Sequence, residues 1–387
     1  MSDAAVYLDH AASTPLREAA REALRDVEGV AAANASGAHR AARRARAAID
    51  DAREALAGVL GADPGDIVFT SGGTESDNLA VLGRHAAVGG RVLCSAVEHP
   101  AVLEATHLVD GKTVGTDERG VVDLDALTAI LDADVSLVSV MTVNNEVGVV
   151  QPVAEIAELV RRSAPSALVH TDAVQALNWV DLRSVTPHVD LLSLSAHKFG
   201  GPQGVGLCVV RRGAEVAARQ VGGGQERERR SGTSNVAGIV AMAAAAVDAD
   251  ASRAEEVVRL ASLRDRLVQL VTTGLDGDVV RTGVARESRS DGDAHIAAGF
   301  AHFCFAGVDS EALLFLLDDA DVYASAGSAC ASGAQHPSHV LEAMGIGHDL
   351  AAGSLRLTLG HTTTADDVDR AAAAVVAAVA RLRRYPR

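Results

Sequence analysis

The sequence predicts an α/β protein with a mainly parallel central sheet flanked by helices, followed by a smaller α+β C-terminal domain. Up to about Asn235, short apolar runs rich in β-branched residues alternate with longer helical patterns. Beyond a helix-rich stretch that ends near Leu275, two strand-like runs alternate with two helical ones. The chain has 387 residues, of which 48% are hydrophobic, so it can bury more than one core.

The central sheet is expected to use six apolar runs: Asp66–Thr70, Arg91–Ser95, Val135–Met141, Ala167–Thr171, Asp190–Ser195 and Val205–Val210. Helical patterns lie between them, and one of these, Val153–Arg162, carries its apolar residues along one side. Ala38–Leu60 is predicted to be a long helix that ends at Gly61, a residue type that favours the helix C-cap.

The C-terminal part is predicted to contain a strand, a helix, a strand and a helix, at Phe300–Phe305, Glu311–Leu317, Ser354–Leu359 and Asp366–Leu382. Before them, the polar stretch Thr282–Asp293 indicates an exposed loop. We therefore expect a large domain over residues 15–255 and a small domain formed by residues 1–14 and 256–387.

Charge and composition exclude several classes of protein. The chain has 35 basic and 51 acidic residues, a net charge of −16, which disfavours general binding to nucleic acids or membrane surfaces. The first residues lack the basic and apolar regions of a secretion signal, and the longest apolar run, Val236–Val247, is short of the ~20 residues that span a bilayer. Four scattered cysteines form no disulfide framework or metal-ligand pair. We expect a cytoplasmic protein with reduced thiols.

Lysine is very scarce: only Lys112 and Lys198 accompany the many arginines. Because the guanidinium of arginine stays protonated and cannot form a Schiff base, a retained lysine indicates a need for an amine. The alternative is that both lysines were left by drift. We adopt that alternative for Lys112, which follows Gly111 in a turn-like stretch.

Three motifs at strand ends carry candidate chemistry. After the strand Asp66–Thr70, a turn at Gly72-Gly73 opens a helix, where backbone N–H groups, the helix dipole and the Thr74 hydroxyl suit a phosphate. An ordinary capped turn between a strand and a helix is the alternative. Asp172 follows a buried strand, and Gln175 comes three residues later. An acid and an amide are therefore available to a pyridinium ring at the edge of the sheet where ligands bind. The alternative for Asp172 is a helix N-cap.

The third motif is Ser195-Ala196-His197-Lys198, at the end of another apolar strand. A lysine at the edge of a dry core has a lowered pKa and is a usable nucleophile, whereas a solvated lysine is the common alternative. The scarcity of lysine in the chain, together with the flanking Ser195 and His197, favours the interpretation of Lys198 as a nucleophile. A phosphate site, an acid for a ring nitrogen and a Schiff-base lysine are together what pyridoxal phosphate requires.

Over essentially its whole length the chain resembles the class-V aminotransferases of pyridoxal-phosphate fold type I, and among them the cysteine desulfurases that supply sulfur for iron–sulfur clusters. The resemblance is carried by specific motifs: Tyr7-Leu8-Asp9-His10-Ala11-Ala12-Ser13-Thr14-Pro15, Phe69 to Asn78, Glu98-His99-Pro100-Ala101-Val102, Val143-Asn144-Asn145-Glu146-Val147-Gly148, Ser195-Ala196-His197-Lys198 and Arg230-Ser231-Gly232-Thr233.

The resemblance implies a homodimer and a set of site residues. It assigns stacking on the cofactor ring to His99, the ring nitrogen to Asp172, and the substrate carboxylate to Asn34 and Arg356. Gly73, Thr74, Ser195 and His197 would hold the phosphate, with Thr233 contributed by the other subunit. The full cofactor set is Gly73, Thr74, His99, Asn145, Asp172, Gln175, Ser195, His197, Lys198 and Thr233.

The cysteines divide into two kinds. Cys94, Cys208 and Cys304 lie in apolar strand-like runs and are expected to be core residues. Cys330 lies in a stretch of Gly, Ser and Ala, which is typical of a surface loop. The resemblance makes Cys330 the sulfur acceptor. No metal site is expected, although Cys330 could ligate a cluster transiently.

We therefore expect an enzyme that converts L-cysteine to L-alanine and leaves a persulfide on Cys330, with Lys198, Cys330 and His99 as catalytic residues. The sulfur would pass to an acceptor protein, either a cluster scaffold or a tRNA-thiolation enzyme. The alternatives are another class-V enzyme, such as an aminotransferase or a selenocysteine lyase, and a sulfur carrier or cluster scaffold without catalysis. Cys330 argues against a plain aminotransferase, and Lys198 argues against a scaffold.

Overall fold

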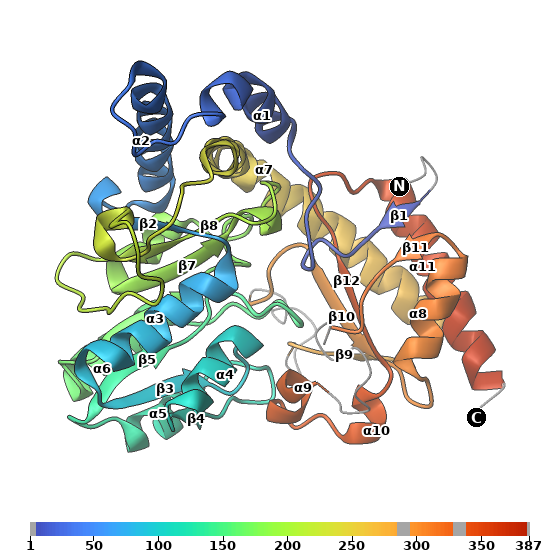
Figure 1. Cartoon of the computed structure of the whole chain (residues 1–387). Helices are drawn as coiled ribbons and strands as arrows, with labels where there is room; N and C mark the ends of the chain where they lie inside the picture. The colour runs from blue at the N-terminus through green and yellow to red at the C-terminus, as the bar shows by residue number, and fades with distance from the viewer. Residues whose placement is uncertain (1–4, 285–294, 328–337, 385–387) are drawn as a thin grey trace.

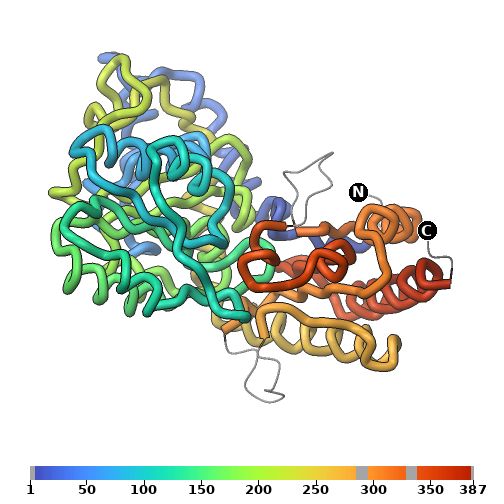
Figure 2. The backbone as a smooth tube through the Cα atoms, turned by 90° about the horizontal axis from the view of Figure 1, so that it is seen from below, coloured from blue at the N-terminus to red at the C-terminus, as the bar shows by residue number. Residues whose placement is uncertain are grey.

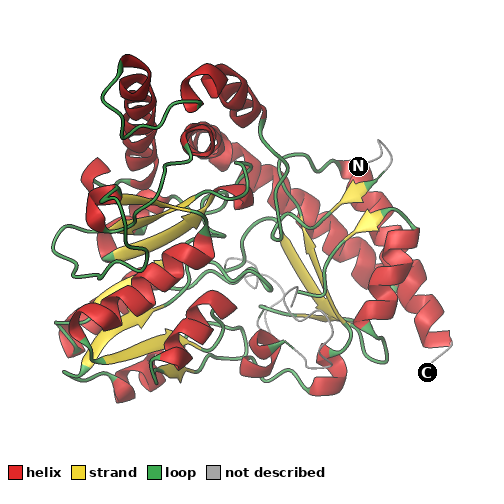
Figure 3. Ribbon diagram, viewed as in Figure 1, coloured by secondary structure: helices red, strands yellow, loops and turns green. Residues whose placement is uncertain are grey.

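A computed structural model describes residues 5–284, 295–327 and 338–384 of the chain. Two lobes are visible in Figures 1 and 2, and the long helix α7 (Val236–Gly274) runs from the first into the second. In the first lobe, helices cover both faces of a twisted sheet (Figure 3). The second lobe combines a smaller sheet with helices, so the expected α/β architecture with an α+β C-terminal part is confirmed.

The large sheet has seven strands in the order β2-β8-β7-β6-β5-β3-β4. Neighbouring strands from β7 to β4 run parallel, and β8 runs antiparallel to both β7 and β2. The strands are β2 (Ile67–Thr70), β3 (Arg91–Ser95), β4 (Lys112–Val114), β5 (Val135–Ser139), β6 (Leu168–Asp172), β7 (Leu191–Ser195) and β8 (Gly206–Val210).

Alternate residues of these strands enter two different cores, which explains why the strands are apolar along their whole length. On one face, Leu191 and Cys208 pack with helices α3 (Gly73–Val88) and α4 (Pro100–Leu108). On the other face, Leu192 packs with α1 (Glu18–Ala31), α2 (Arg40–Leu60), α6 (Val153–Ser163) and the first half of α7.

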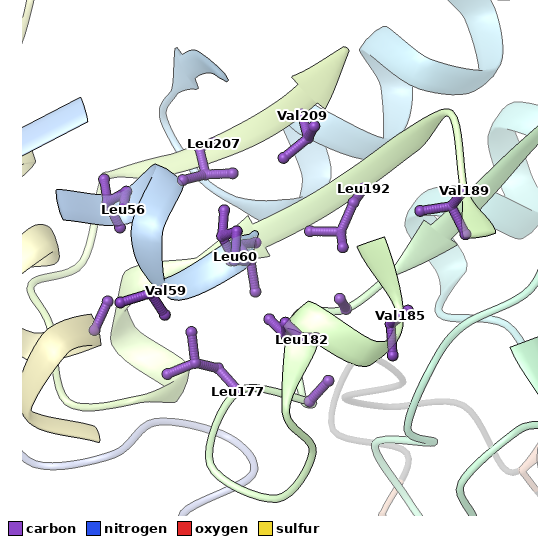
Figure 4. Packing of buried hydrophobic residues seen from close by; sticks show 14 of the residues in the cluster. Leu56, Val59, Leu60, Leu177, Leu182, Val185, Val189, Leu192, Leu207 and Val209 are labelled. Atoms are coloured by element: carbon purple, nitrogen blue, oxygen red, sulfur yellow. The ribbon is translucent and has the colours of Figure 1, made fainter. Parts of the chain in front are cut away.

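Figure 4 shows part of this second face, where Leu56 and Leu60 of α2 lie among Leu192, Leu207 and Val209 of the sheet. Helix α2 ends as the sequence predicts, because Gly61 takes the left-handed conformation (φ 64°) and its N–H bonds the Ala57 carbonyl. The buried positions predicted for Cys94, Cys208 and Cys304 are also confirmed.

The second lobe is built on the antiparallel sheet β12-β10-β9, formed by β9 (Val280–Arg281), β10 (Phe300–Cys304) and β12 (Ser354–Thr358). Near the N-terminus, β1 (Val6–Tyr7) pairs with β11 (Val322–Tyr323). The second half of α7 packs here with the remaining long helices, α8 (Ser310–Asp319) and α11 (Ala365–Arg384). Shorter helices are α5 (Leu124–Ile130), α9 (His339–Ala343) and α10 (His348–Ala351).

Two local predictions are wrong. Lys112 does not lie in a turn but begins β4, an edge strand of only three residues whose exposed Lys112 and Thr113 give no apolar pattern. Thr282 was expected in an exposed loop but is 3% exposed, because the chain continues from β9 along β10: the Thr282 N–H donates to the His302 carbonyl at 3.2 Å, and the Thr282 hydroxyl hydrogen-bonds His302 Nδ1 at 2.8 Å. Residues 285–293 of that predicted loop lie outside the described part of the chain.

Candidate active site

A cavity of about 660 Å³ lies where the large sheet meets the second lobe, at the carboxyl ends of the parallel strands. Its size suits a small-molecule ligand, and this edge of an open α/β sheet is where ligands bind. The second lobe contributes Gly327, Ser338, His339 and Arg356 to the wall. The cavity brings together ten residues that the sequence singled out: Gly73, Thr74, His99, Asn145, Asp172, Gln175, Ser195, His197, Lys198 and Arg356.

Lys198 reaches the cavity from a 3-10 turn (Ala196–Lys198) that follows β7 directly. Its Nζ donates hydrogen bonds to the carbonyl oxygens of Ala11 (2.7 Å) and Ala12 (3.0 Å), which also line the cavity. The half-buried amine is therefore held at one place in the wall by backbone acceptors.

Asp172 ends β6 and is 5% exposed. Burial raises the pKa of its carboxyl to about 6, whereas the Val174 N–H, which donates to Oδ1 at 2.9 Å, and the charge of Lys198 act in the opposite direction. A buried carboxyl with one backbone donor is a suitable partner for a cation in the cavity.

The first turn of α3 forms another part of the wall. A side chain at Gly73 would place a Cβ atom 2.8 Å from Val174 Cγ2, so glycine allows α3 to begin next to the segment that follows β6. The exposed Thr74 lies in this turn, and Ser195 and His197 approach the same cavity from the end of β7. Free backbone N–H groups and hydroxyls at a helix N-terminus suit a phosphate.

His99 is the N-cap of α4, and its Nδ1 accepts the N–H of Ala101 at 3.1 Å. Burial, followed by the charge of Lys198, lowers the pKa of His99 to about 4. The ring is therefore neutral near pH 7, with its proton on Nε2 because Nδ1 is an acceptor. Burial likewise lowers the pKa of His197 to about 4.

Arg356 lies in the middle of β12 and is 2% exposed. Its Nη1 donates to the Asn145 carbonyl and its Nη2 to Asp9 Oδ1, both at 2.7 Å. These bonds fix a cationic fork at the cavity wall. Gln175, which comes from the segment after β6, donates from Nε2 to the Ala11 carbonyl at 2.8 Å.

Two predicted site residues in the described part of the chain, Thr233 and Asn34, do not line this cavity. Thr233 is exposed and lines a separate pocket that includes Ser71 and Arg230. Asn34 is exposed in the segment between α1 and α2, where its Oδ1 accepts the N–H of Ser36 at 2.9 Å. Cys330 lies outside the described residues.

Sequence reasoning missed four residues around the cavity: Asp77, Glu98, Glu146 and His339. Glu146 accepts a 2.5 Å hydrogen bond from the Ser338 hydroxyl, and His339 donates from Nε2 to the Glu98 carbonyl at 2.8 Å. The first three stand inside motifs that the sequence singled out, but their burial at 3% exposure or less follows only from the fold.

Within the described ranges, no group of three or more His, Cys, Asp or Glu side chains is placed to hold a metal ion. No helix in these ranges is long and apolar enough to cross a bilayer.

Comparisons with known proteins agree with this geometry. Residues 6–371 match the family described as aminotransferase class-V. The chain is 44% identical to an IscS-like cysteine desulfurase of Mycobacterium tuberculosis (strain ATCC 25618 / H37Rv), over 98% of this chain and 97% of the relative. It is 40% identical to a cysteine desulfurase IscS of Dictyoglomus turgidum (strain DSM 6724 / Z-1310), over 94% and 92%.

Solved structures give the same result for the fold. A NifS-like protein superposes with a TM-score of 0.88 at 31% identity, over 97% of this chain and 100% of the other. A NifS-like protein from Rickettsia africae ESF-5 superposes with a TM-score of 0.86 at 27% identity, over 98% and 99%. These likenesses confirm the expected fold type I. The chain belongs to the class-V aminotransferase family and, within it, to the cysteine desulfurases.

Proposed function

We propose that this protein is a pyridoxal-phosphate-dependent cysteine desulfurase that converts L-cysteine to L-alanine and transfers the sulfur to Cys330. The observation that carries the proposal is the convergence of Lys198, Asp172 and His99 on one cavity, in a chain whose relatives are named cysteine desulfurases. A solved relative, SspA in complex with cysteine, superposes with a TM-score of 0.76 at 28% identity over 91% of this chain, which supports the choice of substrate.

The residues of the cavity fit pyridoxal phosphate in three respects. Lys198 offers an amine, Asp172 offers a buried carboxyl for a ring nitrogen, and the first turn of α3 offers donors for the phosphate. The neutral imidazole of His99 can stack on an aromatic ring without bringing a second cation to it. When bound, this cofactor supplies an electron sink for charge that develops at the substrate α-carbon.

The residues of the chain then have separate tasks. Arg356 binds the substrate carboxylate through its guanidinium fork, and Asp9 and the Asn145 carbonyl keep that fork in place. The Lys198 amine moves the proton at the substrate α-carbon. His99, which is neutral near pH 7, accepts or donates the proton of the substrate thiol.

Sulfur transfer requires a thiolate nucleophile. In our proposal the Cys330 thiolate attacks the substrate sulfur, so that the new S–S bond forms as the C–S bond of the substrate breaks. The electron pair of the broken bond stays with the carbon, which gains a proton and leaves as alanine. The persulfide on Cys330 then passes to an acceptor, which we propose to be a cluster scaffold or a tRNA-thiolation enzyme.

The remaining assignments are also part of the proposal. Thr233 completes the phosphate site of a second subunit in a homodimer. Two observations support this role: the Arg230–Glu75 ion pair at 2.8 Å holds the segment of Thr233 near the start of α3, and Thr233 itself is exposed. Asn34 assists Arg356 at the substrate carboxylate. The cytoplasmic location and the transient ligation of a cluster by Cys330 remain predictions.

We also propose the domain boundaries predicted from the sequence, with residues 15–255 as the large domain and residues 1–14 and 256–387 as the small one. The support is a change of core along α7: its buried hydrophobic residues up to Ala249 belong to the core of the large sheet, and those from Leu260 onward belong to the core of the small lobe. The boundary at residue 255 falls between them.

Replacement of Cys330 by alanine tests the function. Since Lys198, Asp172 and the α3 turn do not involve this thiol, Cys330→Ala should keep the visible absorption of the bound cofactor. Alanine release from cysteine should nevertheless collapse, because a methyl group cannot attack sulfur. Cys304→Ala, the same change at a buried thiol that does not line the cavity, should retain alanine release. If Cys330→Ala keeps most of its activity, the protein is instead a β-eliminating lyase or an aminotransferase.

A further inference from the structure

Asp77 is a buried acid at the cavity for which the proposed mechanism has no task. It lies in α3 one turn after Gly73, is 1% exposed, and lines the same cavity as Asp172. Its Oδ1 has no hydrogen-bond partner in the part of the chain that the structure describes. A buried carboxyl oxygen without a donor is costly when charged, so this position calls for an explanation.

The groups that face Asp77 do not neutralise it. His170, on β6, places Nε2 3.7 Å from Asp77 Oδ1, but burial lowers the pKa of His170 to about 3, so its ring is neutral. The two ring nitrogens of His170 are engaged by the hydroxyls of Ser139 (2.8 Å) and Ser193 (3.0 Å). Ser193 favours the charged form of Asp77, whereas Asp172 and Glu98 are acids and oppose it.

Asp77 and Asp172 therefore compete for a single negative charge. Two carboxylates in one low-dielectric cavity do not both ionise readily, so one of them keeps a proton. Asp172 receives the Val174 N–H and is stabilised by Lys198, while no backbone donor reaches Asp77 Oδ1. Burial, followed by the charge of Asp172, raises the pKa of Asp77 well above its ordinary value. The proton consequently belongs to Asp77.

We propose that Asp77 is a second carboxyl of the cofactor-ring site: it holds a proton while the cavity is empty and releases that proton when a cationic ring nitrogen pairs with Asp172. The inference rests on the proposed cofactor. Its chemistry is a simple acid dissociation, in which the Asp77 O–H bond breaks, the electron pair stays on the carboxylate, and the proton passes to a buffer base. The empty cavity thus avoids two buried charges, and the loaded cavity gains a second counter-charge for the ring.

Proton release makes cofactor affinity depend on pH in a way that Asp77→Asn removes, because an amide does not titrate in this range. We would measure the binding of pyridoxal phosphate to the cofactor-free protein between pH 6 and pH 9. The affinity of the unaltered protein, divided by that of Asp77→Asn, should rise at least about tenfold over this range. For Asp190→Asn, the same change at the residue just before β7 and outside the cavity, the ratio should stay constant. A constant ratio for Asp77→Asn would overturn the inference.

Stability of the cofactor-free protein gives a second and independent readout. Since the folded-state pKa of Asp77 is raised, its stabilising contribution is complete below the unfolded pKa of about 3.9 and is lost as the pH rises through the folded pKa. The Tm of Asp77→Asn relative to the unaltered protein should therefore increase from pH 5 to pH 8. Asp77→Ser should show the same trend, which covers the case in which the amide does not fold.

The two readouts separate this inference from the proposed function. If the unaltered protein fails to bind pyridoxal phosphate while the Tm difference still increases with pH, the proposed cofactor is wrong and Asp77 still holds a proton. If the cofactor binds normally but both the affinity ratio and the Tm difference are independent of pH, the role of Asp77 is wrong and the proposed function stands.

Discussion

The two lobes contribute to the cavity in different ways. On the large sheet, Lys198, Asp172 and His99 stand at or just beyond the carboxyl ends of strands, in turns and at a helix start. On the small sheet, Arg356 projects from the middle of β12 and is as deeply buried as the core residues around it. The large-sheet side also brings the buried acids Asp77 and Asp172 to the cavity, with Glu98 next to the lining residue His99, whereas the small lobe supplies the guanidinium.

This difference matches the two ligands of the proposed reaction, the cofactor and the amino-acid substrate. An acidic wall with one amine suits a cationic ring that carries a phosphate at its other end, and an arginine fork suits the carboxylate of an amino acid. The large sheet would then bind the cofactor and the small lobe would select the substrate. Variants on the two sides should accordingly fail in different ways.

The largest effect is expected on the cofactor side. Lys198→Ala should lower alanine formation at least about a thousandfold, because both the attachment of the cofactor and the proton transfer at the α-carbon depend on this amine. Lys112→Ala removes the other lysine of the chain, which is exposed on β4, and should leave the activity unchanged. Equal losses in the two variants would mean that Lys198 has no special role.

A smaller and different effect is expected on the substrate side. Arg356→Lys keeps the charge but cannot bond the Asn145 carbonyl and Asp9 in the same fork geometry. The KM for cysteine should rise about 10- to 100-fold, the range for losing a charged hydrogen bond, while the absorption of the bound cofactor stays unchanged. Arg381→Lys on the exposed end of α11 is the control. A loss of cofactor absorption in Arg356→Lys would break the division between the lobes.

Residues that follow directly after strands could be predicted from the sequence. The six predicted strands all occur in the large sheet with ends shifted by at most two residues, because their apolar runs end at polar turn motifs. Lys198, Asp172 and the Gly73 turn, which all line the cavity, were singled out for the same reason: they follow those runs directly. The three-residue edge strand β4 was missed because so short a strand, with two exposed residues, leaves no pattern.

Residues that depend on tertiary contacts were not predictable from the sequence. Glu146 meets Ser338 across 192 positions of the chain, and the burial of Thr282 depends on His302 in a neighbouring strand. In the sequence, Asp77 looks like an ordinary polar residue of a helix, and its burial follows only from the packing of α3 against the sheet. Asn34 and Thr233 stay predictions, because neither reaches the cavity within one chain.

The smallest effect concerns Glu98, a buried acid next to the cavity-lining His99. Glu98 accepts the Met141 N–H (2.7 Å) and the Ser95 hydroxyl (2.8 Å), yet burial raises its pKa to about 8. Its stabilising contribution is complete below about pH 4.3 and is lost as the pH rises to about 8. Glu98→Gln retains an oxygen for both donors, so its Tm relative to the unaltered protein should increase by about 2 °C or more from pH 5 to pH 9. Thermal denaturation across this range checks the sign, and a decrease would contradict the account.

The central claim is that the cavity at the strand ends holds pyridoxal phosphate on Lys198. Reduction of the purified protein with borohydride should fix a pyridoxyl group covalently, and peptide mapping by mass spectrometry then identifies the modified lysine. The choice is clear because the chain has only two lysines. The account predicts the label on the peptide that contains Lys198 and none on the peptide that contains Lys112. A label on Lys112, or no label on either lysine, would contradict it.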